Sequence, residues 1–253
     1  TAQKLMEEVK AEAAGKNISV TVNIFHSRFI KKDRAKLEEE IIKFGKTYDK
    51  NGNLDKQSGI WIATSIVEAS LDIDFDYLFT ELLDLNSLFQ RFGRCNRKGA
   101  KNVTMYNCYV YTQLDEGDFI FENKGFIDKT IFELSNKAIH EINGKLSESK
   151  KQDLINKYLT MENISQSHFI KEFRKKYREI DAIKIYSFEK NEEKLRNILS
   201  ETVIPEIVYE RHKKEIDIIS EKLISERLTA IERKRLRSDI LQYSLDIPYY
   251  HWS

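Results

Sequence analysis

The chain has 253 residues, of which 41% are hydrophobic and 11% aromatic. It has 42 Lys and Arg residues and 41 Asp and Glu residues, so its formal net charge is +1. This composition excludes wholesale disorder, and the length allows one large or two modest domains with their own cores. Because no stretch approaches 18 uncharged apolar residues and residues 1–30 lack a signal-peptide layout, we expect no membrane partner. Two cysteines, Cys95 and Cys108, are too few for a disulfide scaffold or a four-ligand zinc site, which indicates a reducing, intracellular setting.

The first half of the chain alternates helical and strand-like segments. The expected helices are 1–14, 33–44 and 85–92, and the expected strands are 18–25, 60–64, 76–80 and 103–111. Such alternation with short connections predicts a parallel, three-layer α/β sheet. Ligands bind such sheets beyond the carboxyl ends of the strands, where this sequence places the polar segments 26–28 and 65–74.

The second half of the chain has a different composition, because no glycine follows Gly144 and the two prolines are Pro205 and Pro248. This predicts mostly long helix, at 126–160 and 188–243, with a turn into a short strand at 173–188 and another strand at 202–209. The change of composition places a domain boundary within the polar stretch 113–125.

Residues 90–99 (QRFGRCNRKG) carry the strongest functional signal, because Arg91, Arg94 and Arg97 recur at every third position. At a helix end, two guanidinium groups with this spacing can converge on one anion, and arginine suits polyphosphate because it stays charged and offers a planar set of donors. Gly93 would let either the backbone or a facing element approach closely. The alternative is a solvated basic helix face.

Residues 62–76 (IATSIVEASLDIDFD) follow the second strand with hydroxyl and carboxylate side chains. Thr64 and Ser65 can hold a phosphate at a helix N-terminus. The carboxylates can bind a metal, act in acid–base chemistry or accept from a ribose hydroxyl, and they belong to Glu68, Asp72, Asp74 and Asp76. The alternative is a helix cap followed by surface acids.

These two segments resemble motifs V and VI of superfamily 2 helicases, and residues 26–28 resemble motif IV. The residues of these three motifs most resemble those of the CRISPR-associated helicase–nuclease of type I interference systems. The matching positions are residues 25–29 (FHSRF) with Arg34 for motif IV, Ala63, Thr64, Glu68 and residues 70–76 (SLDIDFD) for motif V, and Leu88, Gln90, Arg91, Gly93, Arg94 and Arg97 for motif VI.

The resemblance implies a second RecA-like helicase domain in residues 1–115, followed by linker helices and a mainly helical C-terminal accessory domain in residues 116–253. It implies that Arg91 and Arg94 reach the β- and γ-phosphates of ATP, with Arg94 as the arginine finger and Gln90 in support. It implies that Asp72 binds the ATP ribose or links the nucleotide site to the DNA strand. The residues implied to contact single-stranded DNA are Thr64, Ser65, Ser27 and Arg28.

The chain lacks two parts that such an enzyme requires. It has no GxxxxGK[ST] loop, because the tripeptide GKT at 45–47 has Glu40 where the first glycine would stand, and a helix stop explains that tripeptide better. It also lacks a histidine–aspartate pair of the HD nuclease type. We therefore expect the C-terminal part of a longer protein whose first RecA-like domain binds most of the ATP and Mg²⁺, and this chain alone should not hydrolyse ATP.

The resemblance further implies an antiviral, ATP-dependent translocase in the cytoplasm, with an HD nuclease domain and a Cascade-type CRISPR surveillance complex as partners. Two other functions stay open: the second motor domain of another superfamily 2 DNA or RNA helicase, and a non-catalytic nucleic-acid-binding module. The basic clusters at 211–214 and 233–237 fit either a DNA-facing surface or a solvated helix face. We expect no metal site, because His140, His168 and His212 are scattered.

Overall fold

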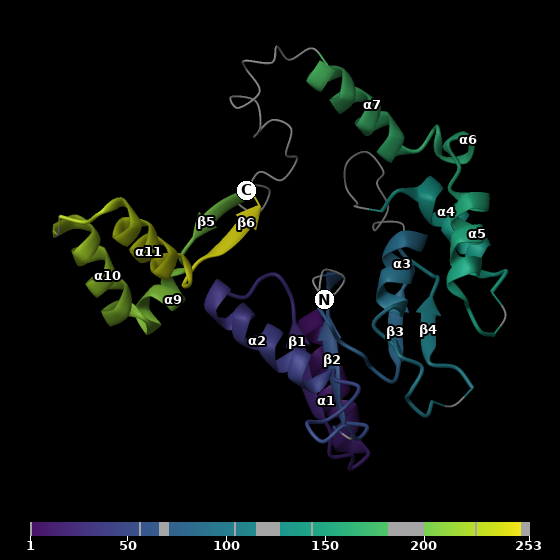
Figure 1. The fold of residues 1–253 in the computed structure, drawn as a ribbon, viewed down its shortest axis with the longest axis horizontal. Helices are drawn as coiled ribbons and strands as arrows, with labels where there is room; N and C mark the ends of the chain where they lie inside the picture. The colour runs from purple at the N-terminus through teal and green to yellow at the C-terminus, as the bar shows by residue number, and fades with distance from the viewer. Residues whose placement is uncertain are drawn as a thin grey trace. The chain divides into compact units, whose positions relative to one another are not determined.

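The computed structural model describes residues 2–55, 57–65, 71–103, 105–114, 127–142, 144–181, 200–225 and 227–248 (Figure 1). The chain divides into two compact units. Unit 1 is Thr1–Phe44, Gln57–Leu71 and Arg196–Ser253, and unit 2 is Gly45–Lys56 and Asp72–Leu195. The domain boundary predicted between residues 115 and 116 lies outside the described residues and stays a prediction.

Unit 1 contains α1 (Ala2–Gly15), β1 (Thr21–Phe25), α2 (Lys31–Phe44), β2 (Gly59–Ala63), β5 (Ser200–Val203), α9 (Glu206–Arg211), α10 (Lys213–Ser225), α11 (Ala230–Leu241) and β6 (Leu245–Pro248). Unit 2 contains β3 (Leu78–Glu81), α3 (Leu85–Phe92), β4 (Cys108–Tyr111), α4 (Lys129–Ile139), α5 (Glu148–Tyr158), α6 (Met161–Ile164) and α7 (His168–Asp181). The three helices and four strands expected in the first half of the chain are all confirmed, although β1 begins at Thr21 rather than at residue 18 and β4 begins at Cys108 rather than at residue 103.

The sheet of unit 1 is a parallel pair in which Thr21 is opposite Gly59 and Phe25 is opposite Ala63. The helix α1 packs on this pair (Figure 1). A Cβ atom at Gly59 would lie 3.1 Å from both the Phe44 ring and the Thr21 carbonyl oxygen, so glycine lets the end of α2 approach the strand closely.

The start of α2 is held by the C-terminal segment of unit 1. The Lys31 amide donates to the Ser244 carbonyl at 3.0 Å, and the Lys32 amide donates to the Gln242 carbonyl at 2.9 Å. The first amides of a helix have no partner within the helix, so these two bonds satisfy groups that would otherwise need water. Residues 242–244, directly after α11, therefore fix the entry of α2.

Unit 2 has its core beneath α3. Leu82, Leu85 and Leu88 are completely buried, and the other buried members of the core are Phe89, Ile127, Phe132, Ala138 and Leu154. The Asp84 carboxylate caps α3 by accepting from the Ser87 amide at 3.0 Å. One face of α3 is thereby fixed against the core, which leaves Gln90 on the exposed face.

The strands pair as parallel neighbours, as predicted, since β1 pairs with β2 and β3 pairs with β4. Among the described residues they form separate two-stranded sheets rather than one sheet. The chain is thus a mixed α/β protein, and the single three-layer sheet stays a prediction. The strands β5 and β6 form an antiparallel pair.

Two expectations for the second half of the chain were wrong. Residues 173–181, expected as a turn into a strand, continue α7, because Phe169, Phe173 and Tyr177 recur at the four-residue spacing of one helix face; the rest of that segment lies outside the described residues. The strand expected at 202–209 ends at Val203, because Pro205 caps the start of α9. No helix in the described part of the chain is long and apolar enough to cross a membrane.

Candidate nucleotide and nucleic-acid site

The second half of the motif V segment and the motif VI segment meet in unit 2. Phe75 and Cys95 form an isolated parallel bridge. The Phe75 amide donates to the Arg94 carbonyl at 2.8 Å, and the Asn96 amide donates to the Phe75 carbonyl at 2.7 Å. Asn96 adopts a left-handed backbone conformation with φ of 44°, which asparagine tolerates better than most residues. The backbone of one segment therefore fixes the turn that carries the arginines of the other.

The carboxylate of Asp74 lies at the centre of this junction and is only 3% exposed. It accepts from the Thr47 hydroxyl at 2.7 Å and from the Arg97 amide at 2.7 Å. The Asp74 amide donates to the Gly45 carbonyl at 2.7 Å. The helix α2 ends at Phe44, as expected. The bond between Thr47 and Asp74 was not expected, because no local pattern links residues 27 positions apart.

The side chain of Arg91 is directed at β3. Its Nε atom donates to the Ser87 carbonyl at 3.2 Å, and its Nη1 atom donates to the Glu81 carbonyl at 3.0 Å and to the Thr80 hydroxyl. These contacts join the last turn of α3 to the end of the neighbouring strand. Arg91 thus has a structural role in addition to the phosphate contact that the resemblance implies.

The three motif VI arginines do not share a helix face, because α3 ends at Phe92 and Gly93 is its C-cap. Gly93 has φ of −65°, and a Cβ atom there would lie 3.3 Å from the Gln90 carbonyl of its own helix. Of the two possibilities, the close neighbour of Gly93 is thus the backbone of its own helix end and not a facing element. Arg94 is half-buried in the following turn, and Arg97 is exposed.

Asp72, the residue implied to bind the ribose, has a side chain that is 85% exposed and forms an ion pair with the Arg97 guanidinium. A carboxylate accepts hydrogen bonds only, so its exposed oxygens suit the hydroxyl donors of a ribose. Asp72, Gln90, Arg91 and Arg94 all lie in unit 2. Two residues of the motif V resemblance, Glu68 and Ser70, lie outside the described residues.

The residues implied to contact DNA lie in unit 1, at one edge of the β1–β2 sheet. Ser27 and Arg28 follow β1, whereas Thr64 and Ser65 follow β2, and all four are exposed. Both segments follow the carboxyl ends of strands, as the sequence predicted, and because Phe25 is paired with Ala63 they leave the sheet side by side. The Thr64 amide itself donates to the Phe25 carbonyl at 3.2 Å.

His26 shapes the turn after β1. Its ring stacks on Phe29 with centroids 4.4 Å apart, and its Nδ1 atom accepts from the Arg28 amide at 3.1 Å. Burial and the nearby Arg28 charge lower the pKa of His26 below its usual 6.5. The neutral ring therefore supports the backbone of Arg28, a role that the sequence analysis did not assign.

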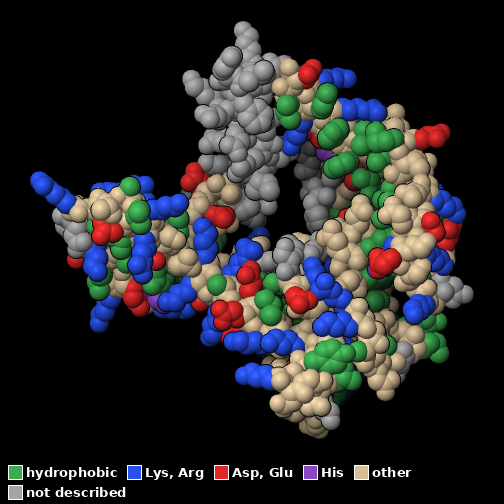
Figure 2. Space-filling model, in the orientation of Figure 1, with side chains coloured by type: hydrophobic (Ala, Val, Ile, Leu, Met, Phe, Trp, Pro, Cys, Tyr) green, Lys and Arg blue, Asp and Glu red, His purple; other side chains and the backbone are tan. Residues whose placement is uncertain are grey.

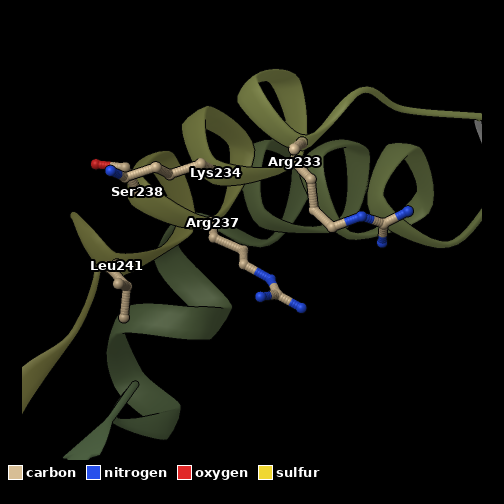
Figure 3. Close-up of a pocket in the computed structure, with 6 residues that line it drawn as sticks. Arg233, Lys234, Arg237, Ser238 and Leu241 are labelled. Atoms are coloured by element: carbon tan, nitrogen blue, oxygen red, sulfur yellow. The ribbon is translucent and has the colours of Figure 1, made fainter.

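The helix α11 carries a basic face in unit 1, and Figure 2 shows Lys and Arg side chains gathered over α10 and α11. Arg233, Lys234 and Arg237 extend from this helix beside Ser238 and Leu241 (Figure 3). None of these three cations forms an ion pair with another described residue. Among the described residues, no three His, Cys, Asp or Glu side chains are close enough to hold a metal ion.

Residues 1–100 match the family model described as the C-terminal region of CRISPR-associated nuclease/helicase Cas3. The Cas3 endonuclease/helicase of Escherichia coli K12 is 41% identical over 85 residues, which are 34% of this chain and 9% of that protein. A putative Cas3 nuclease/helicase of Methanocaldococcus jannaschii is 37% identical over 111 residues, which are 43% of this chain and 14% of that protein. The matched part is thus a small fraction of each relative.

Solved structures have a similar fold. The crystal structure of T. fusca Cas3 with ATP matches with a TM-score of 0.52 and 20% identity, over 70% of this chain and 21% of that one. A structure titled as a CRISPR-associated protein matches with a TM-score of 0.54 and 16% identity, over 90% of this chain and 28% of that one. Over residues 1–100, this chain is therefore similar in sequence to the C-terminal region of the CRISPR-associated nuclease/helicase Cas3.

Proposed function

We propose that this chain forms the second RecA-like domain and the C-terminal accessory domain of an ATP-dependent, single-stranded-DNA translocase of type I CRISPR interference. The observation that carries this proposal is the junction in unit 2, where hydrogen bonds through Phe75 and Asp74 hold the motif V and motif VI segments together. The names of the curated relatives support a nuclease/helicase as the whole protein. The three-layer RecA-like sheet is part of the proposal.

The nucleotide half of the site lies on unit 2. Arg94 acts as the arginine finger on the γ-phosphate, Gln90 supports it from the exposed face of α3, and Asp72 accepts from the ribose hydroxyls. Arg91 contributes to the phosphate contact while it anchors the helix to β3. ATP and Mg²⁺ are held mainly by a first RecA-like domain, so this chain completes the site when the two domains close.

The DNA half of the site lies on unit 1. The exposed hydroxyls of Ser27, Thr64 and Ser65 and the Arg28 side chain contact the phosphodiester backbone at the edge of the β1–β2 sheet. Such contacts are independent of sequence and weaken as salt rises. The proposal also assigns the basic face of α11, with Arg233, Lys234 and Arg237, to the surface that contacts the strand.

The Cascade-type surveillance complex and an HD nuclease domain are the partners in this proposal. A motor domain alone can only unwind DNA or translocate along it, so recruitment to the target and cleavage of the DNA require the surveillance complex and the nuclease domain. Translocation runs 3′ to 5′. A different appended domain in the reading frame that contains this chain would instead favour another superfamily 2 helicase.

The test is the DNA-stimulated ATPase of the longer protein that contains this chain. Arg94→Ala should lower kcat by about 10³- to 10⁵-fold, as expected for the loss of an arginine finger. Arg178→Ala, which removes an exposed arginine on α7, is the matched control and should keep the full rate. Equal rates in the two variants would refute the arginine-finger role.

The DNA contacts need a separate measurement. Arg28→Ala should weaken binding of single-stranded DNA and make it less dependent on salt, because one phosphate contact is lost. Lys16→Ala, which removes a cation already paired with Glu12 at 2.7 Å, should leave both quantities unchanged. An unchanged salt dependence in Arg28→Ala would contradict the assignment.

A further inference from the structure

The geometry around Asp74 points to a positioning role that lies beyond the residues proposed above. We infer that Asp74, together with Thr47, is a positioning element of the motor, in which the Asp74 carboxylate holds the motif VI turn in its working position. This inference rests on the proposed function. Asp74 touches neither nucleotide nor DNA in this role and acts through the turn that carries Arg94 and Arg97.

The carboxylate of Asp74 connects two loops that are far apart in the sequence. Its Oδ1 atom accepts from the Arg97 amide, and its Oδ2 atom accepts from the Thr47 hydroxyl, each at 2.7 Å. Both oxygens are therefore used, one for each loop. A buried carboxylate is costly unless such donors satisfy it, so the two loops hold each other through a group that tolerates little displacement.

The backbone beside Asp74 reinforces the same connection. The Asp74 amide donates to the Gly45 carbonyl, and the next residue, Phe75, exchanges two hydrogen bonds with Arg94 and Asn96. The loop that follows α2, the motif V strand and the motif VI turn are thus tied at successive residues. A shift of Asp74 would be transmitted to Arg94, because the Arg94 carbonyl accepts directly from Phe75.

The Asp74–Thr47 pair also lies close to residues of the proposed nucleotide site. A cavity of about 190 Å³ opens beside it, and its lining includes Asp72, Asp74, Thr47 and Arg97. Asp72 is the proposed ribose contact, and its ion pair with Arg97 lies on the exposed side of the same turn. The Asp74–Thr47 pair therefore holds the buried side of this turn, and the exposed side of the turn faces the nucleotide in the proposed function.

Three variants in the longer protein separate positioning from folding. Thr47→Val removes one hydroxyl at constant shape, Asp74→Ala removes both acceptors, and Asp74→Asn keeps one acceptor while its amide can donate to Thr47. Thr202→Val is the matched control, because Thr202 donates to Asp246 at 2.6 Å in the same kind of bond, on an exposed sheet edge.

The expected result is a loss in kcat without a loss in nucleotide affinity. Thr47→Val should lower the kcat of the DNA-stimulated ATPase by roughly 2- to 10-fold and Asp74→Ala by about 100-fold or more, with KM for ATP within about twofold of the unsubstituted protein. Asp74→Asn should recover most of the rate. Thr202→Val should leave kcat and KM unchanged. If Asp74→Ala does not fold, Thr47→Val and Asp74→Asn carry the test.

Hydrogen exchange gives a readout that does not depend on activity. The Arg97 amide should exchange faster in Asp74→Ala than in Thr202→Val, because its acceptor is lost. Equal exchange at Arg97, or variants with the kcat of the control, would overturn the positioning role. So would a raised KM at unchanged kcat. If the unsubstituted protein had no DNA-stimulated ATPase activity, the proposed function itself would be refuted. The failure of the positioning role is seen in the variants, whereas the failure of the proposed function is seen in the unsubstituted protein.

Discussion

Replacing Arg91 by alanine should destabilise unit 2 by about 2–3 kcal/mol. The guanidinium donates to three acceptors, of which the Ser87 carbonyl and the Thr80 hydroxyl are partly buried and the Glu81 carbonyl is exposed. Hydrogen bonds from a charged donor contribute about 1.5–3 kcal/mol each when buried, whereas water replaces an exposed one at little cost. The two remaining contacts are only partly buried, so each is taken at or just below the low end of that range, about 1–1.5 kcal/mol, and together they give this magnitude.

The measurement is hydrogen exchange of the α3 amides, Leu85–Phe92, since this helix carries Arg91 and lies on the core of unit 2. A loss of 2–3 kcal/mol corresponds to roughly 30- to 150-fold faster exchange of amides that open with the unit. Arg91→Lys should recover less than half of the loss, because an ammonium group cannot reproduce the forked geometry.

The control is Arg97→Ala, which removes an ion pair whose two side chains are 47% and 85% exposed. Such a surface pair contributes about 0–1 kcal/mol, so the α3 amides should exchange at nearly the original rate. If Arg91→Ala changed exchange no more than Arg97→Ala, the anchoring of α3 to β3 through Arg91 would be wrong.

Two further predictions test the packing of α3 and the turn after β1. Leu88→Ala should lower the free energy of unfolding of unit 2, measured by urea denaturation, by about 3–5 kcal/mol, because Leu88 is fully buried in the core. Asn86→Ala, on the exposed face of the same helix, should change this free energy by less than about 0.5 kcal/mol, and similar losses in the two variants would contradict the docking of α3. The pKa of the His26 ring, followed by NMR, should lie below 6.5. Because the folded state disfavours the charged ring, the free energy of unfolding should fall as the pH drops from 6.5 toward this lowered pKa. A titration midpoint of His26 at or above 6.5 would contradict the effect of burial and of the Arg28 charge.

Local patterns in the sequence were enough to predict the elements near the site. The apolar residues Leu85, Leu88 and Phe89 have helical spacing, and Gly93 follows them, so α3 was placed at its observed residues. The polar segments after β1 and β2 were predicted to follow the carboxyl ends of strands, and the observed parallel pairing of β1 and β2 places both at one edge. The pattern failed at residues 173–181, which were expected as a turn leading into a strand, whereas they continue the helix α7.

The arrangement within the site was less predictable. The three-residue spacing of the arginines assumed a continuous helix, whereas the chain turns at Gly93 and sends the Arg91 and Arg97 side chains to different partners. The tripeptide at 45–47 was correctly taken as a helix end, but its threonine also binds a carboxylate 27 residues away. Spacing along a sequence describes neighbours on one element and carries no information on such a contact.

The sequence by itself determined the elements of the first half of the chain and their parallel pairing, because these depend on periodicity, caps and short connections along the chain. Only the tertiary structure decided that Asp74 is buried between two loops, that Arg91 is anchored to β3 and that residues 242–244 hold the start of α2. The physical reason is the range of the interactions. Backbone preference and amphipathic spacing act within a few residues, whereas burial and the hydrogen bonds that burial requires depend on which distant segments come together.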